Sequence, residues 1–231
     1  MLHRCFWVTD NDLYKKYHDE EWGVPVYDDQ ILFEFLILET FQAGLSWITI
    51  LSKRENFRTA FDNFDYKKIA NYSNRTLEAL LNEKGIIRNK LKIRSAILNA
   101  QLFMEIQKEF GSFSTFIWGF VNGNPIVNEF ENREAVPVTT PLSDKISKEL
   151  KKRGFKFTGS RVIYAYMQAV GMVNDHTKDC FKSFKKIVLT KDIGDKNLNY
   201  LFPLTYSSNT RQTSFCQIGP WGSTLPDPLT Y

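Results

Sequence analysis

The chain has few cysteines and no long apolar run, and each absence excludes a class of protein. Its 231 residues include three cysteines, whose spacing does not fit a disulfide framework. No apolar stretch approaches the ~20 residues that a membrane-spanning helix needs, and the first residues lack the pattern of a secretory signal. We therefore expect a soluble protein of a reducing cytosolic or nucleoid compartment, with no membrane partner.

An excess of charge of one sign is also missing. The formal net charge is +4, and residues 1–180 hold 24 Lys and Arg against 23 Asp and Glu. The charge is nevertheless segregated, because residues 84–94 and residues 151–161 each hold five cations and no acid. Such runs are usually solvated helix faces. Two runs that each contain a glycine favour contact with phosphate.

Hydrophobic periodicity predicts an all-α fold. Residues 1–184 should form one domain, whereas the segment 185–231 is rich in polar and turn-forming residues and should be a flexible tail that adds little to the core. A weak strand pattern occurs at 138–140, and residues 122–142 should form a loop. The predicted helices span 12–19, 29–39, 46–61, 74–82, 89–110, 113–121, 143–153 with Ser143 as its cap, and 161–172.

Glu39 occupies an unusual position for a carboxylate. On a helix it shares one face with Leu32, Phe35 and Leu36, which should turn toward the core. A buried carboxylate is costly unless it is paired, so two interpretations stay open. Glu39 is either a structural carboxylate satisfied by backbone or arginine, or it is held in an apolar pocket to recognise a ligand. With Trp47 beyond a small-residue turn, it would suit a flat, electron-poor ring.

Cysteine and histidine residues predict a metal site. The spacing His176-x3-Cys180 would place both side chains on one face of a helical turn, although such pairs are common by chance. Cys5 and His18 complete a set of two cysteines and two histidines. Four protein ligands close a tetrahedral zinc site, so the zinc should be structural and not catalytic. We expect loss of Cys180 to release the metal and lower the melting temperature while the ring pocket stays intact.

Residues 154–161 lie between two predicted helices. The sequence fits a helix–hairpin–helix, in which free backbone N–H groups and a helix N-terminus bind a DNA phosphate. A lone Gly-x4-Gly, here Gly154 to Gly159, is more often only a helix cap and a turn. The five neighbouring cations favour DNA.

Taken together, these motifs closely resemble the DNA-3-methyladenine glycosylase I family over nearly all of residues 1–180. The resemblance is specific because it combines several separate segments. They are Cys5-Phe-Trp7, Tyr14-x2-Tyr17-His18-Asp-x2-Trp22-Gly, Leu38-Glu39-x2-Gln42-Ala-Gly-Leu-Ser-Trp47, Lys53-Arg-Glu-Asn, Lys151-Lys-Arg-Gly-Phe-Lys-Phe-Thr-Gly159 and Asn174-Asp-His176-x3-Cys180. The tail departs from the family, which normally ends near residue 184.

The resemblance implies a helix–hairpin–helix glycosylase that removes 3-methyladenine from DNA in base-excision repair. Its partners would be double-stranded DNA with alkylated bases and the free base as product, and we expect a monomer with one Zn²⁺. Glu39 is the favoured catalytic residue and Asp175 the second candidate. The implied zinc ligands are Cys5, His18, His176 and Cys180, the implied pocket residues are Trp7, Tyr14, Tyr17, Trp22 and Trp47, and the implied DNA contacts are Gly44, Leu45, Gly154, Phe155, Lys156, Phe157, Thr158, Gly159 and Arg161.

Two other functions fit part of the sequence. A non-catalytic module that senses lesions would share the basic hairpin and the zinc, and the Glu39 pocket distinguishes it from an enzyme. A zinc-stabilised interaction protein that does not bind DNA would leave the two segregated basic runs unexplained.

Overall fold

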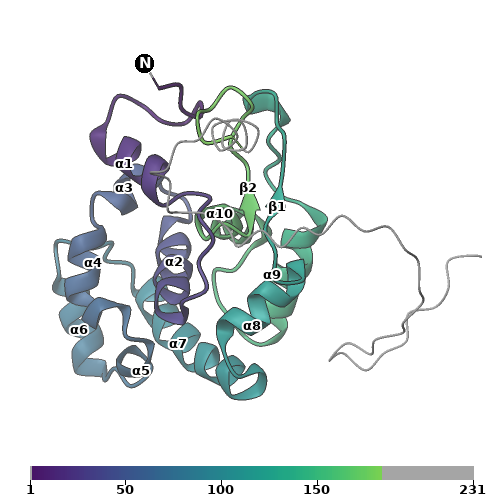
Figure 1. The fold of residues 1–231 in the computed structure, drawn as a ribbon. Helices are drawn as coiled ribbons and strands as arrows, with labels where there is room; N and C mark the ends of the chain where they lie inside the picture. The colour runs from purple at the N-terminus through teal and green to yellow at the C-terminus, as the bar shows by residue number, and fades with distance from the viewer. Residues whose placement is uncertain (1, 184–231) are drawn as a thin grey trace, which may run out of the picture. The chain divides into compact units, whose positions relative to one another are not determined.

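The computed structural model describes residues 2–183, and these residues form a mostly helical body (Figure 1). The predicted tail 185–231 lies outside the described residues. Within the described part, none of the helices is both long enough and apolar enough to cross a bilayer. The helices are α1 Asp12–Glu20, α2 Asp29–Gln42, α3 Trp47–Leu51, α4 Arg54–Ala60, α5 Tyr66–Ile69, α6 Asn74–Asn82, α7 Lys90–Phe110, α8 Phe113–Trp118, α9 Pro141–Lys152 and α10 Ser160–Ala169, with 3-10 turns at Asp62–Phe64, Gly119–Val121 and Arg133–Ala135 and strands β1 Ile126–Val127 and β2 Val173–Asn174.

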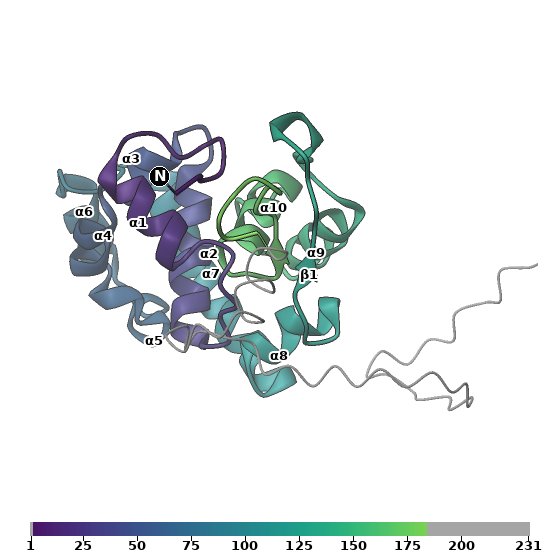
Figure 2. The ribbon, with the colours of Figure 1, turned by 45° about the horizontal axis from the view of Figure 1, so that its top comes forward.

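Helix α2 lies in the middle of the body. Figures 1 and 2 show α4 and α6 on one side of it and α9 and α10 on the other. Every residue from 32 to 41 is buried, including two glutamates and a threonine. The face predicted to turn toward the core is buried as expected, and the other sides of the helix are buried as well. A helix that is enclosed by neighbours on all sides buries its whole circumference.

Side-chain caps explain where several helices begin. Asn11, Asp28 and Asn89 each accept hydrogen bonds from the first free amides of α1, α2 and α7, as N-cap residues do. For α9 the predicted cap is wrong. Thr140 is the N-cap, and Ser143 lies three residues later, where it completes a capping box by bonding back to the Thr140 backbone.

Two predicted helices differ from those observed. The helix expected over 46–61 is broken at residues 52–53 into α3 and α4. The helix expected to end at Met172 stops at Ala169. Gly171 there has φ +69, and a Cβ on it would lie 2.4 Å from the backbone nitrogen of Pro25. The chain must leave the helix here because the segment after α1 crosses at close range.

The structure also corrects the strand prediction. Residues 138–140 form no strand. Instead β1 and β2 pair in parallel, with Ile126 opposite Val173 and Val127 opposite Asn174. This short pairing lies inside the predicted 122–142 loop on one side and beside His176 on the other. It forms because tertiary packing brings the two segments together, a cause that local sequence pattern does not record.

Candidate functional site

Two buried glutamates on α2 have opposite surroundings. Glu34 accepts a hydrogen bond from Arg54 Nε at 2.6 Å and one from Arg58 Nε at 3.1 Å. Glu39 is 3% exposed, and its Oε2 has no hydrogen-bond partner among the described residues. Glu34 is therefore a structural carboxylate that is paired with arginine. The structure favours the ligand-facing interpretation for Glu39, because an unpaired buried carboxylate is costly.

Glu39 faces a cavity of about 330 Å³. All six residues predicted for the base pocket line it, brought together from the N-terminal segment, α1, α2 and α3. They are Trp7, Tyr14, Tyr17, Trp22, Glu39 and Trp47. Other lining residues had no signal in the sequence. They are Tyr164 and Gln168 of α10, the 136–138 loop, Phe6 of the N-terminal segment and Gln42 at the end of α2. The apolar α10 pattern gave no signal that its polar side chains face a ligand site.

The aromatic rings that line the cavity contact one another, edge to face for Trp7 with Tyr14 and Trp22 and tilted for Tyr17 with Trp47. The Trp7 ring centroid lies 5.1 Å from that of Trp22 and 5.6 Å from that of Tyr14, and Tyr17 lies 5.3 Å from Trp47. The indole Nε1 atoms of Trp7 and Trp47 are buried and have no hydrogen-bond partner within residues 2–183. Two free donors and one free acceptor in an aromatic cavity are complementary to a heteroaromatic base.

Burial raises the pKa of the Glu39 carboxyl to about 8. The carboxyl of the empty pocket is therefore mostly neutral at pH 7. A cation beside it would stabilise the carboxylate and lower its pKa again. The cavity thus has a group that gains a negative charge when a positively charged ligand enters.

The pH dependence of stability should report this carboxyl. Between about pH 4.5, the ordinary value, and about pH 8, the folded protein keeps a proton that the unfolded chain has released. The free energy of unfolding should therefore fall as the pH rises through this window. Glutamine does not titrate, so the Glu39→Gln variant should not lose this stability as the pH rises. Its free energy of unfolding relative to that of wild type should therefore increase by roughly 1–3 kcal/mol across the window. Urea unfolding of both proteins from pH 5 to pH 8 measures it, and parallel curves would contradict the assignment.

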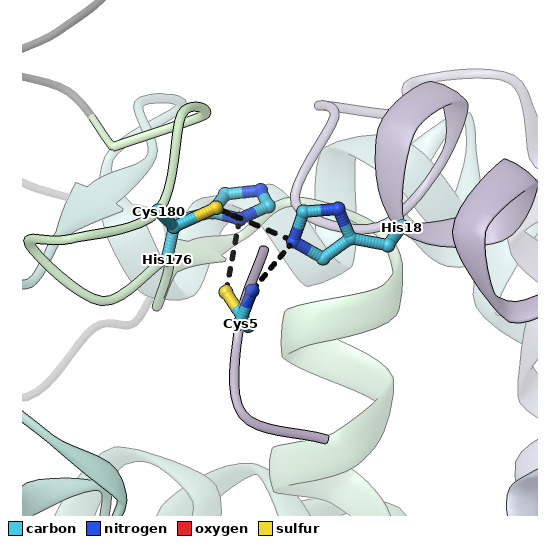
Figure 3. Close-up of side chains that lie close together, drawn as sticks. All are labelled: Cys5, His18, His176 and Cys180. Carbon is cyan, nitrogen blue, oxygen red and sulfur yellow. Dashed lines mark hydrogen bonds between the residues drawn. The ribbon is translucent and has the colours of Figure 1, made fainter. Parts of the chain in front are cut away.

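The four predicted zinc ligands meet at one point (Figure 3). Their ligand atoms all lie within 4.8 Å of one another. Cys5 Sγ is 3.4 Å from His176 Nδ1, and Cys180 Sγ is 3.4 Å from His18 Nε2. Bond lengths of about 2.3 Å to sulfur and about 2.0–2.1 Å to nitrogen place tetrahedral ligand atoms about 3.5 Å apart. The residues therefore fit a zinc ion.

The outer nitrogens of both imidazoles are held in the way that metal-binding histidines require. His18 Nδ1 donates to Asp19 at 2.8 Å, and Arg4 in turn donates to this carboxylate. His176 Nε2 donates to the Trp22 carbonyl at 3.2 Å. Each ring then directs a lone pair toward the sulfurs. Burial also lowers the pKa of His176, which favours the neutral form that binds metal.

The two thiols behave as a pair. The pKa of Cys180 is lowered, mainly by a hydrogen bond from the Cys5 thiol and also by the two histidines, while the pKa of Cys5 is raised by its bond to Cys180. His176 and Cys180 do not lie on a helical turn as predicted. They flank a non-helical turn in which Cys180 N bonds to Thr177 O, and this turn supplies the same proximity.

The cluster of two cysteines and two histidines lies next to the cavity. The Trp22 ring centroid lies 4.7 Å from that of His176, and the Trp7 ring centroid lies 5.4 Å from that of His18. Both tryptophans line the cavity. The imidazoles of the cluster are thus the support on which these two rings rest, so the shape of the cavity depends on the cluster.

Asp175 also lines the cavity and is 2% exposed. Unlike Glu39 it is fully paired. Its carboxylate accepts from Asn128 Nδ2 at 2.7 Å, from Tyr164 OH at 2.6 Å and from Gln168 Nε2 at 2.7 Å. The hydrogen bonds join the β1 segment to α10, so Asp175 has a clear structural task.

The segment 153–159 connects α9 and α10 as a tight turn. Gly154 has φ +99, a conformation that L-residues rarely adopt, and Gly159 is the N-cap of α10 without any side-chain cap. Phe155 and Thr158 are buried, so those two predicted contacts could reach DNA only through their backbone. Four cations of the 151–161 run form no ion pair with the described residues, whereas Arg153 is paired with Glu109 and Glu149.

A second turn lies at the rim of the cavity. It joins α2 to α3, contains Gly44 with φ +82, and exposes 40% of Leu45. Gln42 from this turn and Arg161 from the start of α10 both line the cavity. The structure therefore places both predicted DNA-contact segments beside its opening.

Comparison with known proteins gives consistent matches. Residues 7–183 match the model of the family described as methyladenine glycosylase. The chain is 47% identical over 180 residues to the DNA-3-methyladenine glycosylase of Haemophilus influenzae, and this alignment covers 78% of this chain and 97% of that protein. A crystal structure of 3-methyladenine DNA glycosylase I superposes with TM-score 0.77 at 47% identity, covering 78% of this chain and all of that one. A variant of glycosylase I in complex with 3-methyladenine superposes with TM-score 0.74 at 35% identity, covering 77% of this chain and 95% of that one.

Proposed function

The chain belongs to the methyladenine glycosylase family, and on that basis we propose that it excises 3-methyladenine from alkylated DNA. The observation that carries this function is the cavity lined by seven aromatic side chains and the unpaired Glu39. The family membership confirms the resemblance seen in the sequence. The alternative is a lesion sensor without catalysis, and the base-release experiment at the end of this subsection distinguishes the two.

The reaction is hydrolysis of an N-glycosidic bond. The enzyme must first take the base out of the helical stack, because the bond and the base edges are not accessible inside the duplex. Water then adds to C1′ of the deoxyribose, and the bond from C1′ to the purine nitrogen breaks. The purine leaves with the bonding electrons, so a cationic base becomes neutral, and an abasic site remains.

Methylation at N3 makes the purine a positively charged leaving group, so selective capture is a harder task than acid catalysis. Contact with a Trp or Tyr face stabilises a cation by about 0.5–2 kcal/mol per ring. Glu39 adds a carboxylate that accepts a hydrogen bond from the purine. With its pKa near 8, ionising it at pH 7 costs only about 1–2 kcal/mol. A cationic base offsets this cost, whereas neutral adenine does not.

We also propose a structural zinc ion at Cys5, His18, His176 and Cys180. It would tie the N-terminal segment and α1 to the segment after β2. No ligand position remains for water, so the ion would supply rigidity and no chemistry. The chain also supplies the acceptors that orient the two imidazoles, because His18 donates to Asp19 and His176 donates to the Trp22 carbonyl.

The turn 153–159 is proposed to bind the DNA backbone as a helix–hairpin–helix. Support comes from the uncapped first turn of α10, whose free amides and helix dipole attract a phosphate. Arg161 and three lysines add unpaired positive charge. Such contacts position the DNA without reading its sequence.

Gly159→Glu should test this contact. A Cβ on Gly159 meets no atom within 4 Å, and its φ is not in the left-handed region, so the variant should fold normally. The added anion should nevertheless weaken binding to any duplex by about tenfold or more, because phosphate contacts dominate affinity. Fluorescence anisotropy at ~0.1 M salt, where screening is incomplete, measures it. Gly159→Gln is the matched control for added bulk without charge, and equal affinity of wild type and Gly159→Glu would refute the hairpin contact.

The function itself is tested by release of free base. Full-length protein is incubated with methylated duplex DNA, and the supernatant is separated by chromatography. Free 3-methyladenine, with abasic sites left in the DNA, is the expected result. Tight binding of methylated DNA with no base released would identify a lesion sensor in place of an enzyme.

A further inference from the structure

A buried lysine on α7 contacts two loops at once. Lys92 is 6% exposed, and its Nζ donates to the carbonyls of Phe41 and Ala43, each at 2.7 Å. The same ammonium lies 6.0 Å from the centroid of the Phe157 ring. Lysine is almost never this buried unless it is paired, and here its partners are backbone oxygens of one loop and an aromatic ring of another.

Lys92 supplies a cation that α2 lacks. The last turn of α2 contains no basic residue, and its final carbonyls carry the negative end of the helix dipole. Ala43 is the last residue before Gly44, whose φ of +82 reverses the chain. By holding the Ala43 carbonyl, Lys92 fixes the direction in which Gly44 and the exposed Leu45 leave the helix.

Asn99 holds the backbone of the 154–159 hairpin, as Lys92 holds the Ala43 carbonyl. It lies two turns after Lys92 on the same face of α7 and is fully buried. Its Oδ1 accepts from Lys156 N at 2.9 Å, and its Nδ2 donates to Lys156 O at 3.1 Å. Both backbone groups of Lys156 are thereby held just before Phe157, which adopts φ +57, an uncommon conformation for a residue with a side chain.

We propose that Lys92 and Asn99 are positioning residues that hold the 42–46 turn and the 154–159 hairpin at a fixed separation, so that both meet the DNA together. The inference rests on the proposed function, because it requires the two loops to be the DNA contacts. The 21-residue helix α7 is the element that joins them. Neither side chain faces the cavity or the solvent, so each acts through the loop that it holds.

The test uses Lys92→Met and Asn99→Leu in the full-length protein, with Lys108→Met, an exposed position on the same helix, as control. Both variants should bind duplex DNA more weakly and excise 3-methyladenine from it about ten- to hundredfold more slowly in single turnovers, because small misplacements of binding groups carry such losses. Binding of the free base, followed by tryptophan fluorescence, should be unchanged. The slope of log affinity against log salt should also be unchanged, since no phosphate contact is removed.

A double variant separates action through the turn from a general loss of stability. Leu45→Ala removes the exposed side chain that Lys92 is proposed to aim. Adding it to Lys92→Met should therefore cost less than it costs in the wild type, because coupled positions are not additive. A general destabilisation would make the two losses additive and would also lower free-base binding.

Three results would overturn the inference. The first is unchanged duplex affinity and excision in both variants. The second is a loss of free-base binding as large as the loss of duplex binding. The third is a shallower salt slope for Lys92→Met, which would make the ammonium a phosphate contact. If the wild type releases no base at all, the proposed function fails. Duplex affinity and the double variant then still test the positioning role separately.

Discussion

Replacing Glu39 with glutamine should lower single-turnover excision of 3-methyladenine about ten- to hundredfold, because a charge-assisted hydrogen bond contributes roughly 1.5–3 kcal/mol. Glutamine keeps the shape of the side chain but cannot become an anion beside a cationic purine. The empty protein should be equally stable or more stable, because the variant removes an unpaired buried carboxyl. Loss of activity together with undiminished stability identifies a group that acts on the ligand.

Asp175→Asn is the matched comparison, because both carboxylates line the same cavity. An amide at this position would turn an NH2 group toward a donor, either that of Asn128 or those of Tyr164 and Gln168, because these donors bond to different oxygens of the carboxylate. The expected result is a loss of stability of about 1–3 kcal/mol and a smaller loss of excision than in Glu39→Gln. Unchanged excision by Glu39→Gln, with near-total loss in a folded Asp175→Asn, would instead assign the catalytic role to Asp175.

Cys180→Ala should release one zinc ion per chain and lower Tm by roughly 10 °C or more, since a structural zinc site contributes several kcal/mol and each is worth about 2–4 °C in a domain of this size. The sequence suggested that the pocket would survive this change. The structure instead predicts that the pocket will be disturbed by this change. Trp7 and Trp22 rest on the imidazoles of His18 and His176, so loss of the metal should loosen both rings and weaken binding of free 3-methyladenine.

Elemental analysis and calorimetry measure the metal and the Tm, and tryptophan fluorescence follows binding of the base. Cys216→Ala is the matched control, because Cys216 is the one cysteine of the sequence outside the ligand set. Protein purified without chelators that contains no zinc would refute the metal site. A Cys180→Ala protein that loses zinc and still binds the base normally would show that the cavity does not depend on the cluster.

Sequence alone determined those features that are local or that consist of rare residues in a specific pattern. The helices predicted at 12–19, 29–39 and 89–110 correspond to α1, α2 and α7, because polar capping residues or recurring apolar side chains mark each of them in the sequence. The family was recognised because indole, imidazole, thiol and carboxylate side chains recur in fixed short spacings. The ligand set Cys5, His18, His176 and Cys180 was predicted from the spacing His176-x3-Cys180 together with the family resemblance.

Tertiary structure alone decided what surrounds each side chain. Glu34 and Glu39 lie on the same enclosed helix, and only the packing of α4 against it gives two arginines to one and none to the other. The cavity wall from α10, the β1–β2 pairing and the contacts of Lys92 with the 42–46 turn all join segments that are far apart in the sequence. Burial, unpaired atoms and shifted pKa values arise from such long-range contacts, and the periodicity of one segment contains no information about which other segment will cover it.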